Sequence, residues 1–381
     1  MTRQTLTACA ALTASFFVPV LQASASAATS YPSASCTSAQ GTTTCDIEPS
    51  ATDALGSGIT PETNSAAFNH TVAPASPRKS PVLVVILGGA TSKPSGYEAL
   101  AAEAASLGYY AVDLRYDNKY LVGDLCRDDD ECFTEFRGMT LFGSHTAVPG
   151  VNGTFAWTQT VTAANSVVNR LVNLLDTLGG YDPAWSKFLV NDAASPYRSL
   201  HHPNGVLPAW NLIVASGHSE GSGDAAFLSL NVPGVRRAAL LSGPDDYYTD
   251  AKGLVHSASW IVSVGGNQSV SKIWGARNAG EGPYGDCTSL NWKDLGLGAS
   301  APGVASCAIP AWEVDVGDGS NVGAADGARF LRFTNYPYGT SLYCHDSTAA
   351  DDNRIDGSSI FPFSPNRTGV WDYLLTADFT D

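Results

Sequence analysis

The chain has 381 residues, of which 44% are hydrophobic and 15% charged, and this balance excludes a disordered or fibrous protein. The formal net charge of −15 argues against nucleic acid and anionic membrane surfaces as partners, because both repel an acidic chain. A chain of this length can bury the core of one large domain or of two small ones.

Residues 1–27 have the features of a secretory signal peptide. Arg3 supplies a positive charge, residues 8–21 form a mostly apolar stretch too short to span a bilayer well, and residues 23–28 are small. The later sequence contains no apolar run of membrane-spanning length. We therefore expect an exported monomer, extracellular or periplasmic, without stable membrane insertion.

The eight cysteines fit an oxidising compartment. Removal of the signal peptide takes Cys9, and short separations favour three disulfides among the rest, although the sequence leaves the connectivity open. The favoured pairs are Cys36 with Cys45, Cys126 with Cys132, and Cys287 with Cys307. This pairing leaves Cys344 over. The cysteines lack the spacing to histidines that is typical of zinc sites, and we expect neither a metal nor a cofactor.

The first predicted elements alternate between strand and helix. Residues 28–80 are rich in Ser, Thr, Ala and Pro and predict an irregular segment with a short hairpin closed by Cys36 and Cys45. Residues 82–87 are continuously apolar, as in a strand buried on both faces of a parallel sheet. A helix over 97–107 and a strand over 109–116 follow.

Two long segments interrupt this alternation. Residues 117–157 and 181–209 are rich in Gly, Pro and aromatic residues, and we expect both at the rim of an active site. The first is interpreted as a lid-like insertion held in part by Cys126 and Cys132. An amphipathic helix over 158–178 lies between them.

The remaining elements complete an α/β pattern. The sequence predicts a strand over 212–214 with a helix after it, strands over 237–241, 272–276 and 329–334, and a closing helix over 371–377. Strands alternating with helices indicate a mainly parallel sheet flanked by helices, in one domain over 81–381.

Residues 217–221 read Gly-His-Ser-Glu-Gly, which is G-x-S-x-G between the strand at 212–214 and its helix. A serine on such a tight turn has a strained backbone, so the flanking residues must be very small. Ser219 is thus the candidate nucleophile, and the N–H of Glu220 points to where an oxyanion would form. The alternative is an ordinary glycine-rich turn.

A nucleophilic serine needs a base, and the base needs a third group to orient it. After a G-x-S-x-G elbow the chain order is serine, acid, histidine, which leaves only His256 and His345. His256 comes too early to leave room for an acid-bearing strand. His345 follows the last predicted strand and precedes the closing helix, so it is the favoured base.

The acid and the oxyanion donors are predicted less sharply. Glu281 follows the strand at 272–276 at a suitable distance, with Asp286 as one alternative and Asp245 or its neighbour Asp246 as another. A second oxyanion donor should come from the loop after the strand at 82–87. Residues 88–90 supply it there, through Gly89 or Ala90.

With these residues in hand, the chain resembles secreted α/β-hydrolases of the lipase and esterase kind over residues 80–378. It is similar to a poorly characterised group with a glycine loop, a Tyr-Asp segment, a two-cysteine insertion, a GHSxG elbow and a late histidine. The resemblance implies an α/β-hydrolase fold, with Ser219 as nucleophile, His345 as base and residues 88–90 as half of the oxyanion hole. Glu281 stands where an aspartate would be expected.

These observations favour a secreted serine hydrolase that cleaves small-molecule or polymeric carboxylic esters through an acyl-enzyme. An amidase or peptidase with the same triad is one alternative. A lipase or polyester depolymerase is another, with an apolar rim formed by Leu141, Phe142, Phe155 and Trp157. A non-catalytic binding protein of the same fold would require a broken triad.

Overall fold

The computed structural model describes residues 34–60, 68–126, 129–143, 161–262, 270–282, 285, 287–297, 303–307, 312–334, 340–351 and 366–377. Among these residues, no helix is both long enough and apolar enough to cross a membrane. The signal peptide expected at 1–27 lies outside the described residues, as do Asp286, Phe155 and Trp157.

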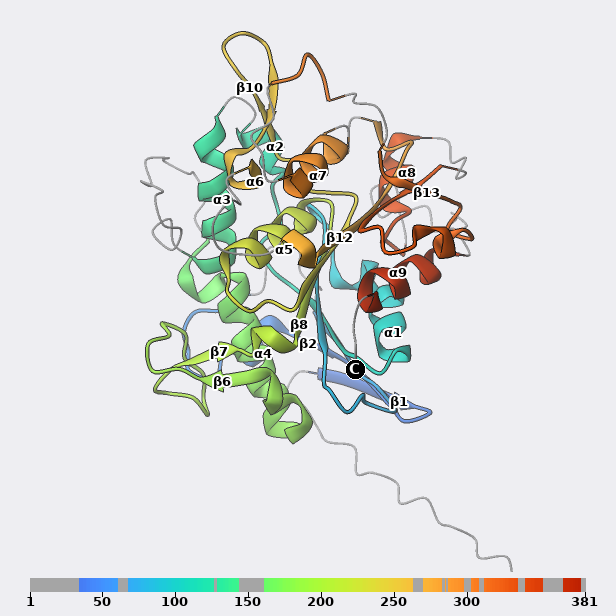
Figure 1. Cartoon of the computed structure of the whole chain (residues 1–381). Helices are drawn as coiled ribbons and strands as arrows, with labels where there is room; N and C mark the ends of the chain where they lie inside the picture. The colour runs from blue at the N-terminus through green and yellow to red at the C-terminus, as the bar shows by residue number, and fades with distance from the viewer. Residues whose placement is uncertain are drawn as a thin grey trace, which may run out of the picture.

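A central sheet organises the described part of the chain (Figure 1). Its strand order is β1-β2-β3-β5-β4-β8-β9-β12-β14-β13, and the pairs from β5 to β13 are all parallel. These parallel strands are β4 (Leu83–Leu87), β5 (Tyr110–Leu114), β8 (Ile213–His218), β9 (Arg237–Leu241), β12 (Ile273–Asn278), β13 (Val314–Gly317) and β14 (Phe330–Phe333). Every residue of β4, β5, β8 and β9 is buried, which confirms the strands predicted from their apolar runs.

Helices cover both faces of this sheet (Figure 1). Alternate residues of β4 point to opposite sides, so Leu83 and Val85 join one core and Val84 and Ile86 the other. The first core contains α3 (Asp130–Phe142), α4 (Val167–Tyr181) and α5 (Glu220–Asn231). The second contains α1 (Glu98–Ser106) and α9 (Arg367–Thr376). The α/β class predicted from the sequence is therefore correct.

The N-terminal segment is more ordered than expected. The predicted hairpin is present as β1 (Ala34–Ala39) and β2 (Thr42–Ile47), but β3 (Asn69–Ala73) also pairs with β2 and joins the sheet antiparallel to β5. Residues 34–47 and 69–73 thus extend the sheet at one edge. The apolar pattern is weak because β1 lies at the exposed edge and needs few buried side chains.

The described part of the 117–157 segment is largely helical, and the lid-like insertion expected there stays a prediction, because residues 127–128 and 144–157 lie outside the described residues. After the short α2 (Val122–Cys126), helix α3 buries most of its residues against α4 and α5. Asp129 begins α3 by accepting hydrogen bonds from the backbone N–H groups of Glu131 and Cys132, and Gly143 ends it in a left-handed conformation.

The 181–209 segment lies away from the expected active-site rim. It contains a 3₁₀ helix (Pro183–Phe188) and the small sheet of β6 (Leu189–Asn191) and β7 (Val206–Pro208). It leads into the amino end of β8, whereas the serine elbow follows the carboxyl end of that strand. Figure 1 shows β6 and β7 at the opposite end of the molecule from α7 (Thr288–Leu297).

Helix α4 begins at Val167, later than predicted. Ser166 caps it, because its hydroxyl accepts a hydrogen bond from the N–H of Asn169 at 3.4 Å, and a 3₁₀ turn (Ala163–Asn165) precedes it. The other described elements are α6 (Ser259–Val262), α8 (Ser341–Asp346), β10 (Tyr247–Thr249) and β11 (Val255–Ser257), with further short 3₁₀ turns.

Three cysteine pairs lie at distances that fit disulfide bonds. The Cα atoms are 4.1 Å apart in Cys36–Cys45, 5.3 Å in Cys126–Cys132 and 4.7 Å in Cys287–Cys307. These are the pairs favoured by their short separations. Cys344 is buried and belongs to none of them.

Candidate active site

The strand order places a switch point beside the serine elbow. From β4 the chain crosses to β5 on one side, while β8 pairs with β4 on the other. In open α/β sheets, ligands bind where the strand order reverses, at the carboxyl ends of the strands. Residues 88–90 follow β4 and Ser219 follows β8, so this geometry brings the predicted glycine loop and the predicted nucleophile together.

The backbone at Ser219 is strained as a G-x-S-x-G elbow requires. Its φ and ψ are 55° and −119°, a conformation that a residue with a side chain rarely adopts. A Cβ atom on Gly217 would overlap the carbonyl of Gly221, and one on Gly221 would overlap the carbonyl of Leu87. Both flanking glycines are therefore required by close packing.

His345 and Glu281 meet in the interior. His345 lies on α8 and Glu281 lies just after β12, and both are buried. The distance from His345 Nδ1 to Glu281 Oε2 is 3.3 Å. The other carboxylate oxygen of Glu281 accepts hydrogen bonds from the Ser242 hydroxyl, at 2.7 Å, and from the backbone N–H of Asn278. The carboxylate is thus held facing the imidazole.

This pairing determines the protonation of His345. Burial alone would lower the pKa of His345, but the hydrogen bond and charge of Glu281 outweigh it, aided by Asp346 and Asp245. The net effect raises the pKa of His345 above its ordinary value. An imidazole held in this way has Nδ1–H directed at the carboxylate and Nε2 directed away from it.

The alternative acids are placed differently. Asp246 is buried and binds Arg137 and the indole N–H of Trp260, the latter at 2.9 Å. Asp245 accepts a hydrogen bond from the backbone N–H of Cys287 at 2.8 Å, and burial raises its pKa to about 7. Neither hydrogen-bonds to His345. Asp286 is not among the described residues.

His218, which precedes Ser219, contacts the proposed base His345. The rings of His218 and His345 have centroids 5.0 Å apart, and His218 Nε2 lies 3.1 Å from the carbonyl oxygen of His345. Within the described ranges, Ser219 Oγ has no hydrogen bond, including none to His345. Such bonds in free enzymes are often absent and tighten when substrate binds.

The two candidates for the second oxyanion donor differ. The N–H of Gly89 donates to the Tyr97 hydroxyl at 2.8 Å, so Gly89 is already engaged. The N–H groups of Ala90 and Glu220 have no hydrogen-bond partner among the described residues. Gly89 serves a steric role instead, since its Cβ would lie 3.0 Å from the Cβ of Ser219.

Tyr97 and His218 form a link that the sequence did not indicate. Because His218 Nε2 donates to the carbonyl of His345, its Nδ1 must accept, and the Tyr97 hydroxyl donates to it at 3.0 Å. Burial lowers the pKa of His218 to about 3, so it stays neutral. The path Gly89–Tyr97–His218–His345 joins the glycine loop, the elbow and the base. Tyr97, His218 and His345 are far apart in sequence, and no local motif marks the link.

Comparison with known proteins gives structural neighbours only. No family model and no curated protein matches the sequence. The similar solved structures include an S-formylglutathione hydrolase from Agrobacterium tumefaciens (12% identity, 82% of this chain and 95% of that one, TM-score 0.39), an acetyl xylan esterase from Aspergillus awamori (10%, 69% and 80%, 0.29) and a putative acetyl xylan esterase from Bacteroides fragilis (10%, 91% and 78%, 0.28).

The fold is established by the strand order and the elbow of this chain itself. The antiparallel β3, the exchanged order of β4 and β5, and a strained serine after β8 are combined with helices on both faces of the sheet. This is the α/β-hydrolase fold.

Proposed function

We propose that this protein is a secreted serine hydrolase that cleaves carboxylic esters. The main support is one arrangement: the strained Ser219 follows His218, whose ring centroid lies 5.0 Å from that of His345, and His345 Nδ1 is 3.3 Å from the buried carboxylate of Glu281. The N–H groups of Ala90 and Glu220, which have no hydrogen-bond partner among the described residues, belong to the residues that follow Gly89 and Ser219. A non-catalytic binding protein would have no need for this arrangement.

The chemistry follows from these positions. Ser219 Oγ attacks the ester carbonyl while His345 Nε2 removes its proton, and Glu281 stabilises the imidazolium that forms. The N–H groups of Ala90 and Glu220 donate to the oxyanion of the tetrahedral intermediate. His345 then protonates the leaving alcohol. Water, activated by the same histidine, hydrolyses the acyl-enzyme and regenerates Ser219.

Esters are favoured over amides because an alkoxide leaves more readily than an amine. An amidase or peptidase with the same triad remains the alternative. The apolar rim expected for a lipase or polyester depolymerase loses one member, since Leu141 is buried in the core and Phe142 packs against it. Phe155 and Trp157 lie outside the described residues.

Export is supported by the cysteines. Three pairs at disulfide distances are typical of a protein that folds in an oxidising compartment. We extend the proposal to cleavage of a signal peptide near residue 27 and to a monomeric mature enzyme. N-terminal sequencing of the exported protein, and its mass in solution, test both points.

Steady-state hydrolysis tests the activity. We expect p-nitrophenyl esters to be cleaved faster than matched p-nitroanilides, and Ser219→Ala to lose about 10³-fold or more in kcat. A series of rising acyl length then separates an esterase from a lipase. Faster cleavage of anilides would favour the amidase alternative. Equal rates for wild type and Ser219→Ala would contradict the proposed nucleophile.

A further inference from the structure

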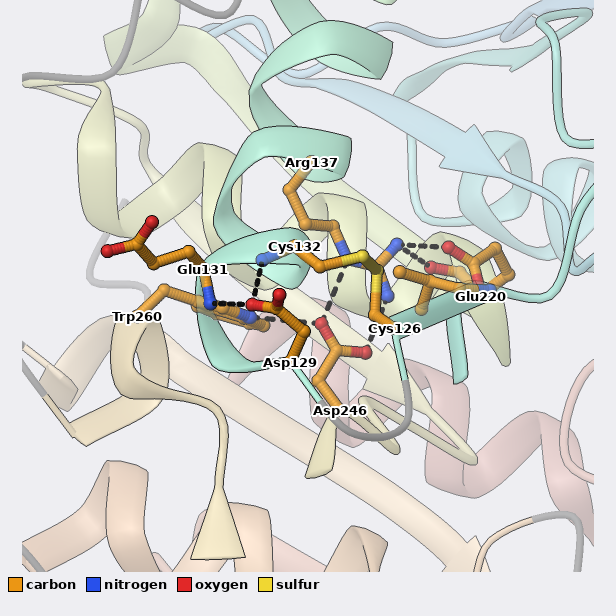
Figure 2. The surroundings of a disulfide bond; sticks show 9 residues. Cys126, Asp129, Glu131, Cys132, Arg137, Glu220, Asp246 and Trp260 are labelled. Atoms are coloured by element: carbon orange, nitrogen blue, oxygen red, sulfur yellow. Dashed lines mark hydrogen bonds and ion pairs between the residues drawn. A yellow bond between two sulfur atoms is a disulfide. The ribbon is translucent and has the colours of Figure 1, made fainter. Parts of the chain in front are cut away.

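A buried arginine lies behind the serine elbow. Arg137, on α3, is 1% exposed and binds three carboxylates, two of which, those of Glu220 and Asp246, are labelled in Figure 2. Its guanidinium binds Asp246 through two nitrogens, at 2.7 and 3.1 Å, and Asp224 at 3.0 Å. The third carboxylate belongs to Glu220, the residue next to Ser219.

Arg137 holds Glu220 at two points. The same guanidinium nitrogen donates to the Glu220 carboxylate and, at 2.9 Å, to the Glu220 backbone carbonyl. The other carboxylate oxygen of Glu220 accepts from the N–H of Val122 at 3.2 Å. Val122 begins α2, which the Cys126–Cys132 pair joins to α3 (Figure 2). The residue whose N–H faces the oxyanion is therefore fixed from two helices.

Helix α5, which follows Ser219, leaves space for the Arg137 guanidinium. A Cβ atom on Gly223 would overlap Arg137, so α5 has glycine where the arginine passes. Asp224, one residue further, is fully buried and faces the same group. A glycine inside a helix lowers its stability by about 1 kcal/mol relative to alanine, so this position serves the contact with Arg137 rather than the helix itself.

The charges of this cluster do not balance when every carboxyl is ionised. Burial raises the pKa of Glu220 to about 8 and that of Asp224 to about 6; the Arg137 charge opposes this rise, and repulsion from the other carboxylates adds to it. The cluster is faced from α3 by Arg137, from the loop after β9 by Asp246, and by Tyr116, whose pKa burial raises. Ionisation of the Glu220 carboxyl, which has the higher pKa, adds negative charge behind the amino end of α5, where an oxyanion would form.

We propose that Arg137 is a positioning residue for the oxyanion hole: it fixes the Glu220 backbone so that its N–H meets the oxyanion, and it offsets the carboxylates behind that site. The inference rests on the proposed serine hydrolase function. Arg137 touches no reacting atom and acts through its contacts with Glu220 and through its charge. Its loss should reduce stabilisation of the transition state more than binding of the ester itself.

The first test compares Arg137→Lys with Arg237→Lys on a p-nitrophenyl ester. Lysine keeps the charge but cannot reach three carboxylates and a carbonyl at once. We expect Arg137→Lys to lower kcat about 10- to 100-fold with little change in KM, which is less than the loss of an oxyanion donor. Arg237 is also buried but binds the backbone near the C-terminal end of α9. Its replacement should lower the melting temperature without this loss of kcat.

The second test uses Glu220→Gln, which keeps the size of the side chain but cannot lose a proton. Wild-type kcat/KM should fall on the alkaline side as Glu220, with a pKa of about 8, ionises. Glu220→Gln should remove that fall, whereas a purely structural role would leave the shape of the profile unchanged. If Arg137→Lys does not fold, the pH profile of Glu220→Gln tests the proposed role of Arg137 in its place.

These experiments distinguish a failure of the proposed ester hydrolysis from a failure of the proposed role of Arg137. A wild-type enzyme without ester hydrolysis overturns the proposed function. An active wild type whose Arg137→Lys variant keeps full kcat overturns the role of Arg137 alone. If Arg137→Lys is unfolded, an unchanged alkaline limb in Glu220→Gln does the same.

Discussion

At the residue scale, the environment of His345 sets the pH dependence expected of the proposed hydrolase. A general base acts when neutral, and the raised pKa of His345 keeps it protonated to higher pH than an ordinary histidine. We expect kcat/KM to fall on the acid side with an apparent pKa above 6.5. Glu281→Gln removes the charge that raises this pKa, so the acid limb should move to lower pH while the maximal rate falls about 100-fold or more.

Asp245→Asn is the matched control for this experiment. It removes a nearby carboxyl that does not hydrogen-bond to His345, so the maximal rate should change by less than about threefold. A pH–rate profile of both variants tests the assignment of the acid. Full activity in Glu281→Gln together with a large loss in Asp245→Asn would show that Asp245 is the acid.

The sequence predicted part of this site for identifiable reasons. Ser219 lies in a local motif, and chain order left few candidates for the base, so the sequence alone was enough to propose Ser219 and His345, whose roles stay predictions. The engagement of Gly89 could not be foreseen, because it depends on a hydroxyl from Tyr97 that packing brings to the loop. Arg137 was missed for the same reason: its partners come from two other parts of the chain.

At the element scale, a buried acid weakens β5. Asp113 is 1% exposed, and neither of its carboxyl oxygens has a hydrogen-bond partner among the described residues. Burial raises its pKa well above 3.8. The folded state therefore binds a proton that the unfolded state releases, and stability falls as the pH rises from about 4 towards the folded pKa.

We accordingly expect Asp113→Asn to stabilise the protein by about 1–2 kcal/mol at pH 8 and by less at pH 4, because asparagine has no charge to bury. Thermal unfolding at both pH values measures this difference. An equal gain at both pH values, or a loss at pH 8, would contradict a titrating Asp113.

The elements that the sequence missed share a physical cause. Helix α3 buries Glu135, Arg137 and Thr140 besides its apolar residues, so its buried face shows no clear apolar period. Strand β3 is buried at residues 69–72, but Asn69, His70 and Thr71 are polar, so its sequence shows no apolar run. The central strands were predicted because both of their faces are covered and their sequences are continuously apolar.

At the scale of the whole molecule, alternation of strands and helices was enough to predict the fold class. The same alternation predicts that residues 181–209 lie away from the active-site rim. A helix that follows one parallel strand runs back along the sheet, so the connection to the next strand must lie at the amino ends. The expectation of an active-site loop there followed composition rather than this rule.

The central claim is that Ser219 is a nucleophile activated by this fold, and covalent labelling tests it most directly. A fluorophosphonate probe should label the wild-type protein once per chain, and peptide mass spectrometry should place the adduct on Ser219. Ser219→Ala, with its fold checked by circular dichroism, should not be labelled. Absence of labelling in the wild type, or equal labelling of the alanine variant, would contradict the account.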